Sequence, residues 1–141
     1  MAVTPAWYGH GLEHIIEGDV DFDDGNVKVA LVDSTYTPDD NGNEYFSEIS
    51  GEITGDGYTA GGQALGNPTM SYSGGVTTLD GDDTTWSDST ITARTAVVYY
   101  DSGTASTSPL LIYQQSDADV SSTSGEFTVA WNASGIGSVN P

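Results

Sequence analysis

Three stretches of the chain, residues 26–33, 91–101 and 109–115, are dominated by β-branched and aromatic side chains. This composition is typical of strands, and the apolar residues of 26–33 fall on both alternating faces, which predicts an inner strand. A connection rich in Gly, Ser and Thr joins 91–101 to 109–115, so we expect these two strands to pair. Residues 126–132 alternate apolar and polar side chains, which predicts a last strand with one buried face.

Polar and glycine-rich segments separate these strands. Residues 70–72 and 76–79 flank the turn sequence Ser-Gly-Gly, which predicts a tight β-hairpin. Six glycines between positions 51 and 66 exclude a helix there and predict irregular β-structure. Residues 44–49 predict a single helical turn after a polar loop.

One short helix is predicted near the N-terminus, over about residues 5–17. Thr4 followed by Pro5 is typical of an N-cap and a first helical position, and Gly18 is typical of the residue that ends a helix. Apolar side chains at helical spacing give this helix one apolar stripe. The stripe consists of Tyr8, Leu12, Ile15 and Ile16.

About six short strands with one small helix predict a mainly β fold. We expect a single domain over residues 1–141, built as a β-sandwich or a jelly-roll-like barrel, with strands to about residue 132 and a short C-terminal tail. The longest apolar run, 96–100, is far shorter than the roughly 20 residues that cross a membrane. No basic and apolar leader begins the chain, so we expect no membrane partner and a protein made in the cytoplasm.

The charge is extreme, with 21 acidic and 2 basic side chains and a formal net charge of −19. Such a surface repels phosphate, so direct binding to nucleic acid is not expected. Molar salt shortens the screening length to about 3 Å and removes most of the internal repulsion. An acidic surface on a protein from a low-salt source is the alternative. Asp outnumbers Glu by 15 to 6 and Lys occurs once, which favours a salt-adapted source.

Two motifs resemble metal sites. The segment His-Gly-Leu-Glu-His at 10–14 matches the zinc pattern H-x-x-E-H, but it has an internal glycine and no identifiable third ligand. We therefore interpret its histidines as ordinary surface residues and expect no zinc. An acidic turn is the second motif, with the weak cation-loop candidates Asp19, Asp21, Asp23 and Asp24.

That acidic turn departs from a calcium loop, because Asp24 stands where the loop needs glycine and Ala30 where it needs glutamate. A solvated turn is therefore preferred to a cation site. The chain has no cysteine and no serine-hydrolase, P-loop or dinucleotide-binding motif. We expect no enzymatic activity, no catalytic residue and no cofactor.

The two basic residues, Lys28 and Arg94, both lie inside predicted strands. A partly buried cation must be paired and hydrogen-bonded, so we predict that Arg94 holds a carboxylate or backbone carbonyls in a largely desolvated place. This pairing is expected within the subunit or across a subunit contact. Lys28 is predicted to do the same less strictly. The alternative is that both side chains simply point outward from the sheet.

Several strings resemble one family over nearly the whole chain: VKVALVDS at 27–34, GYTAGGQAL at 57–65, TWSDSTITAR at 85–94 and AVVYYDSGT at 96–104. In this order they resemble a family of small virion structural proteins of tailed bacteriophages. The resemblance implies that the protein has no catalytic activity. It also implies that the protein is either a head decoration protein or a minor tail component. Acidic loops and the scarcity of lysine depart from bacterial-virus relatives and point to a haloarchaeal tailed virus.

We therefore expect a non-enzymatic capsid decoration or turret protein. It would assemble with itself as a trimer or pentamer and dock on the major capsid protein or neighbouring virion proteins. A minor tail protein is the nearest alternative, and a host glycan-binding module is another. Six aromatic side chains outside the main strands are interface candidates, although they suit a core equally well: Trp7, Tyr8, Tyr45, Phe46, Tyr58 and Trp86.

Overall fold

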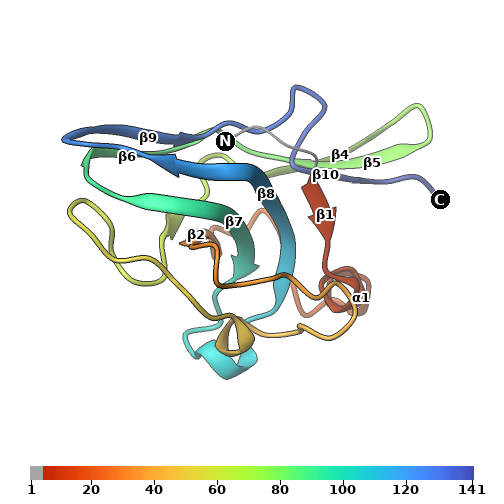
Figure 1. Cartoon of the computed structure of the whole chain (residues 1–141). Coiled ribbons are helices and arrows are strands. Elements are labelled where there is room, and N and C mark those ends of the chain that lie inside the picture. Colours follow the sequence, from red (N-terminus) through yellow and green to blue (C-terminus); the bar gives the residue numbers. More distant parts are fainter. Residues whose placement is uncertain (1–4) are drawn as a thin grey trace.

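The computed structural model describes residues 5–141, which fold into ten strands, one α-helix and two short 3₁₀ turns (Figure 1). The mainly β class with one short N-terminal helix is confirmed. The strands form three antiparallel sheets of a single β-sandwich-like domain. No helix of the described residues is long and apolar enough to span a membrane.

The largest sheet has the strand order β1–β8–β7–β2–β3. Its strands are Pro5–Trp7 (β1), Leu110–Ser121 (β8), Thr92–Tyr100 (β7), Val27–Val32 (β2) and Gln63–Ala64 (β3). The predicted inner strand is β2, which lies between β7 and β3, and the predicted pairing of the two strongest strands is that of β7 with β8. These predictions are confirmed.

Two smaller sheets complete the fold. One has the order β10–β5–β4, from Gly137–Val139, Val76–Asp80 and Thr69–Ser73. The other pairs β6, Thr84–Ser89, with β9, Gly125–Val129. In Figure 1 the β4–β5 hairpin projects sideways from the rest of the molecule.

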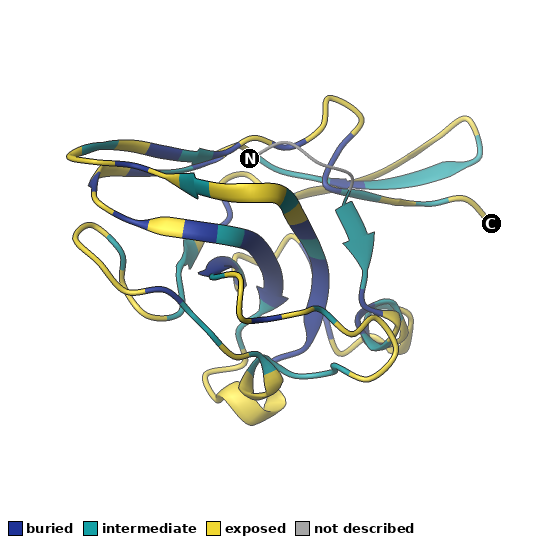
Figure 2. Ribbon diagram, viewed as in Figure 1, coloured by how far each residue is buried: buried dark blue, intermediate teal, exposed yellow. Residues whose placement is uncertain are grey.

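The core lies on both faces of the large sheet, whose central strands are buried in Figure 2. Along β2, Val29 and Leu31 join the larger apolar cluster, which β5, β6 and β9 close from the other side. Ala30 and Val32 face the smaller cluster around Tyr36 and Tyr99. Burial on two faces explains why the β2 sequence is apolar at both parities.

The helix, α1, spans Gly9–Glu17, so the prediction that it begins near residue 5 is wrong. Pro5–Trp7 is instead an edge strand on β8, a position that tolerates proline. Tyr8 is the N-cap, and Gly18 ends the helix at φ 90°. The predicted N-cap Thr4 lies outside the described residues.

The apolar stripe of α1 is only partly buried. Ile16 is 76% exposed, contrary to the prediction, while Tyr8 is fully buried. Gly11 allows the helix to approach β8 closely, because a Cβ at this position would lie 2.3 Å from the Leu110 carbonyl oxygen. A glycine that weakens helix propensity therefore sets how tightly the helix packs on the sheet.

The predicted local turns are present. The hairpin β4–β5 closes through Gly74 and Gly75, whose φ values of 60° and 85° suit a type I′ turn. The predicted helical turn is the 3₁₀ turn Phe46–Glu48, and a second such turn, Ala105–Thr107, lies between β7 and β8.

The prediction of strands to about 132 and a short C-terminal tail is wrong, since β10 follows at Gly137–Val139 and pairs with β5. Three residues are too few for a period to be visible. Strand β8 also runs past the predicted end at 115. Its pairing with β7 jumps from Gln115 opposite Thr95 to Val120 opposite Ala93, so residues 116–119 bulge out of the ladder.

Candidate functional site

The predicted cation loop does not converge on one point. Asp24 accepts hydrogen bonds from the Asn26 amide and the Tyr100 hydroxyl, and these contacts lower its pKa. A hydrogen bond between Asp21 and Asp23 raises the pKa of Asp21. Asp19 turns away to His14. Of the four residues, only Asp19 belongs to a set of possible metal ligands within the described chain.

His14 is buried between two carboxylates, so its interpretation as a surface residue is wrong. Its Nδ1 lies 2.9 Å from Asp19 Oδ2, and its Nε2 lies 2.9 Å from Glu44 Oε1. Burial opposes the charged imidazole, but the hydrogen bonds to the two carboxylates outweigh it and raise the pKa of His14. Burial also acts on Glu44, yet the contacts from His14 and Tyr45 lower the pKa of that carboxyl. The two hydrogen bonds of His14 therefore tie α1 to the loops on both of its sides.

Potential metal ligands surround this histidine. Two sets of side chains in the described residues place their donor atoms within 4.8 Å of one another: His10, Glu13 and Glu44, and His14, Glu17 and Asp19. Imidazole and carboxylate donors suit zinc. Both ring nitrogens of His14 already lie within hydrogen-bond distance of carboxylate oxygens, and His10 bonds to Glu13 at 3.0 Å. The absence of zinc from 10–14 stays a prediction.

The two cations are ion-paired at the edge of solvent. Lys28 Nζ lies 2.8 Å from Asp101 Oδ2, with side chains 36% and 28% exposed. Arg94 Nε lies 2.9 Å from Asp119 Oδ1, with side chains 29% and 50% exposed. Each cation holds a carboxylate within the subunit, but neither is largely desolvated. The Arg94 side chain is slightly less exposed than that of Lys28, whereas Lys28 has the more buried partner. Arg94 is accessible because it lies opposite the bulge at 116–119, where Asp119 swings out of the ladder.

Two of the six interface candidates belong to the core, so this prediction is wrong for Tyr8 and Trp86, which are 0% and 5% exposed. Trp86 packs edge-on against Phe127, with ring centroids 6.2 Å apart. Trp86 is buried because β6 covers the larger apolar cluster, and Tyr8, the N-cap of α1, is buried in the smaller cluster beside Tyr36.

The other four candidates are half-buried and have partners inside the chain. Phe46 stacks on Tyr99 with centroids 4.1 Å apart, and the Tyr58 hydroxyl donates to Glu52 at 2.7 Å. Tyr45 lies against the ring of His14. Trp7 Nε1 donates to the Ser138 carbonyl at 3.1 Å. None of the four therefore presents a free ring to a partner.

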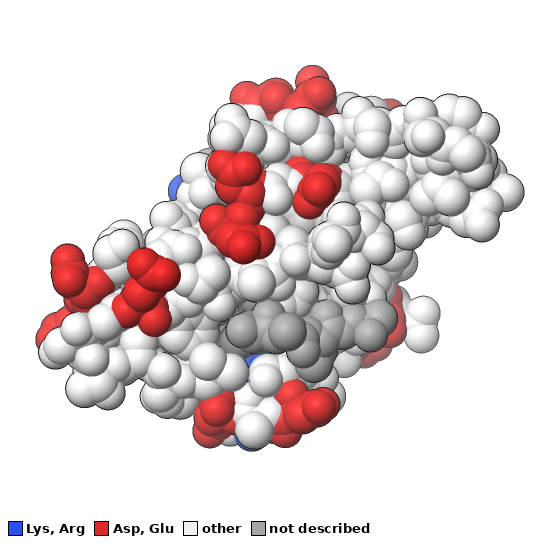
Figure 3. Space-filling view, turned by 90° about the horizontal axis from the view of Figure 1, so that it is seen from above, with Lys and Arg blue, Asp and Glu red and all other residues white. Residues whose placement is uncertain are grey.

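The exposed apolar surface lies on the projecting hairpin instead. All five residues of β4 are exposed, with Met70 at 41% and Tyr72 at 70%. No charged side chain occurs from residue 57 to 79, the longest uncharged stretch of the chain. We call residues 69–79 the arm. Figure 3 shows acidic groups over the rest of the visible surface and none on the end of the projecting lobe.

Sequence reasoning found the hairpin but not its exposure. The available signal was the absence of charge over 57–79 in a chain that carries 21 carboxylates. A segment that is neither charged nor rich in large apolar residues fits neither the acidic surface nor the core.

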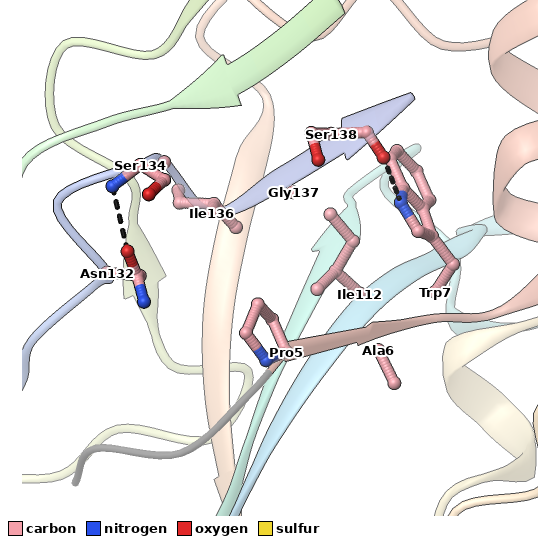
Figure 4. Close-up of a pocket in the computed structure, with 10 residues that line it drawn as sticks. Pro5, Ala6, Trp7, Ile112, Asn132, Ser134, Ile136, Gly137 and Ser138 are labelled. Atoms are coloured by element: carbon pink, nitrogen blue, oxygen red, sulfur yellow. Dashed lines mark hydrogen bonds between the residues drawn. The ribbon is translucent and has the colours of Figure 1, made fainter. Parts of the chain in front are cut away.

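A cavity of about 260 Å³ lies where β1, β8 and β10 meet (Figure 4). Trp7, Ile112 and Ile136 line it together with small polar residues and no titratable side chain. Some of its polar groups are already hydrogen-bonded to each other, since the Ser134 amide donates to Asn132 Oδ1 at 2.8 Å. The cavity can hold a small neutral group, and its described residues supply no acid or base.

A glycan-binding module would present several aromatic rings to solvent. Among the described large hydrophobic residues that are exposed, Tyr72 is the one aromatic, beside Ile16 and Met70. The described surface therefore offers one ring for such a platform, and the glycan-binding alternative stays a prediction.

Comparison with known proteins finds no matching family model, no similar curated protein and no similar solved structure. The resemblance to virion structural proteins therefore stays a prediction from the sequence.

Proposed function

We propose that this protein is a non-enzymatic virion structural protein, a capsid decoration or turret subunit of a haloarchaeal tailed virus. The sequence resemblance supports the virion role, and the acidic loops and scarcity of lysine support a haloarchaeal virus. The structure adds a small domain with one large sheet, buried on both faces, and one projecting arm. In this proposal the domain assembles with itself and docks on the major capsid protein.

The observation that carries the proposal is the contrast between the arm and the rest of the surface. A net charge of −19 disperses copies of the protein in dilute solution, and molar salt removes most of that repulsion. The arm exposes apolar and uncharged side chains through which subunits can meet. Interfaces between proteins are depleted in charge at their centre, as the arm is.

The ionisable side chains that make the best-defined contacts, His14 and Lys28, have structural roles. This supports a protein without catalysis. His14 holds α1 to its neighbouring loops, and Lys28 holds the end of β7 through Asp101. On a closed shell, a repeated subunit must match the local symmetry axes. We therefore keep a trimer or pentamer as the proposed assembly.

The test is the position of this chain in an image of the intact virus particle. The proposal expects the domain in density on the outer shell, at local three-fold or five-fold axes, with the arm in contact with a neighbouring subunit. Density in the tail would overturn the decoration role in favour of the tail alternative. Absence of the chain from purified particles by mass spectrometry would overturn the virion role itself.

A further inference from the structure

The outer edge of β4 is a free strand edge. In the sheet β10–β5–β4, no described strand pairs with β4 on the side away from β5. Ser73 and Val76 flank the two-residue turn, so they form a hydrogen-bonded pair, and Ser71 and Thr69 follow at alternate positions. The backbone N–H and C=O groups of Met70 and Tyr72 therefore point outward, away from β5.

The opposite edge of the same sheet is covered. Ser138 of β10 lies opposite Thr78, and its carbonyl accepts the hydrogen bond of the Trp7 indole. The edge strand β3 of the large sheet has only two residues, Gln63–Ala64. Strand β4 is thus a five-residue edge that is fully exposed and uncharged, without the lysines or prolines that normally block such edges.

We propose that β4 pairs with β4 of a second copy of this chain, antiparallel and with Ser71 on the two-fold axis. In this register, Met70 of each copy lies opposite Tyr72 of the other. The outward-pointing groups of these two residues are the ones that an antiparallel partner needs, and they form four hydrogen bonds across the axis. The strand is therefore self-complementary in its backbone.

The side chains are self-complementary as well. Met70 and Tyr72 lie two residues apart and thus share one face of the strand. Met70 also borders a cavity of about 370 Å³, which Val20 and Phe22 line together with Asp21 and Asp23. Pairing brings the Tyr72 ring of the second copy beside Met70, at the rim of this cavity, where sulfur and ring make a favourable contact.

Charge selects the second copy over other partners. A basic partner would be drawn to the acidic surface and away from the arm, which has no charge to offer. A second copy is equally acidic, so it can approach closely only where neither chain carries carboxylates. Residues 57–79 are the longest such stretch.

The contact is small, because five paired residues bury far less than the roughly 800 Å² per partner of a stable interface. It is therefore weak in free solution, and it becomes effective where copies are held side by side. That consequence rests on the proposed function, since a virion shell holds trimers or pentamers side by side. A two-fold contact cannot close a trimer or a pentamer, so it joins one copy from each of two neighbouring assemblies. The pairing itself is testable on purified protein, so it can fail or succeed independently of the image of the particle.

Cysteine cross-linking tests the register, because the chain has no cysteine of its own. Residues opposite each other in a non-hydrogen-bonded pair have Cα atoms about 4.5 Å apart, within the range of a disulfide. Ser71→Cys is therefore expected to form disulfide dimers rapidly under mild oxidation in molar KCl. Ser73→Cys is the matched control, since two such residues lie about 13 Å apart in this register.

Mixing two different cysteine variants tests the register further. Thr69 and Ser73 of the other copy lie opposite each other, so chains with Thr69→Cys and Ser73→Cys are expected to cross-link when mixed and to stay monomeric alone. Equal cross-linking rates for Ser71→Cys and Ser73→Cys would overturn the proposal. So would cross-linking of Ser73→Cys alone at the rate of the mixture.

A charge test follows in the Ser71→Cys background. Tyr72→Glu adds a carboxylate to the arm and is expected to slow dimer formation at least tenfold. Ile16→Glu adds the same charge at another exposed apolar residue, 76% exposed on α1, and is expected to leave the rate unchanged. Tyr72→Phe keeps the ring and is expected to retain the rate. Equal slowing by both glutamates would show general repulsion and overturn the role of the arm.

Discussion

The large sheet and the arm are both antiparallel β-structure, but they differ in burial. In β7, Ala96, Val97 and Val98 are fully buried. In β4, all five residues are exposed. The large sheet gains its stability from apolar burial on both faces, whereas β4 has backbone pairing on one edge and little burial.

The contrast between the sheet and the arm shows that an exposed segment of this chain lacks charge. Several surface segments elsewhere carry Asp or Glu, which bind water and keep copies apart. The arm carries neither charge nor a full apolar face, so it contributes little to solubility or to the core. Such a segment is best explained by a contact with another protein, as proposed above.

The largest effect is expected from salt, because it acts on all 21 carboxylates at once. Going from about 10 mM to about 1 M KCl shortens the screening length from about 30 Å to about 3 Å. We expect the melting temperature to rise by more than about 10 °C, equivalent to about 2 kcal/mol. A melting temperature in dilute buffer equal to or above that in molar KCl would contradict salt adaptation.

A pair of substitutions compares sheet and arm directly. Leu31→Ala removes a fully buried side chain from β2 and is expected to lower the free energy of unfolding by about 2–5 kcal/mol. Tyr72→Thr removes an exposed ring while retaining strand propensity, and a change below about 0.5 kcal/mol is expected. Chemical denaturation in molar KCl measures both. Similar losses for the two variants would mean that the arm packs on the sheet.

His14 links the helix to the loops on both of its sides, and its contribution depends on pH. Its raised pKa means that its stabilisation is complete below the unfolded pKa of about 6.5 and is lost as the pH rises through the higher folded value. The lowered pKa of Glu44 means that its contribution is present above about 4.5 and is lost as the pH falls through the lower folded value. The two contributions therefore coincide between about pH 4.5 and 6.5.

We expect His14→Gln to lose about 1–2 kcal/mol relative to the natural chain near pH 5.5, and less above pH 7. The exposed His10, with its single carboxylate partner, provides the control variant His10→Gln, for which a smaller and flatter loss is expected. Unfolding titrations across pH measure both. A loss for His14→Gln that does not change with pH would exclude the charged form.

The smallest effects are expected at the two ion pairs. Lys28 lowers the pKa of Asp101 through its hydrogen bond, which shows the pairing to be favourable. Because both pairs are partly solvated, we expect losses of about 1 kcal/mol or less for Lys28→Gln and less still for Arg94→Gln. A loss of about 3 kcal/mol for Arg94→Gln would restore the buried pair that the sequence predicted.

Much of the fold was predictable from local patterns. Strands β2, β7 and β9 show apolar runs or alternation, and the β4–β5 turn has two glycines that adopt positive φ. Strands β1 and β10 were missed because three residues carry no visible period. For the candidate site, the uncharged stretch 57–79 was visible in the sequence, but residue types alone could not indicate that Tyr72 would be the exposed aromatic ring.

The sequence by itself determined the β class, the hairpin and the acidic surface, because these depend on residue types and short-range spacing. The tertiary structure alone decided which residues meet. His14 lies against Glu44, 30 positions away, and Arg94 against Asp119, 25 positions away. Gly62 passes so close to β2 that a Cβ would lie 1.8 Å from the Val29 carbonyl oxygen. The exposed edge of β4 likewise follows from where the other strands lie, since a strand is an edge only when no neighbour reaches it.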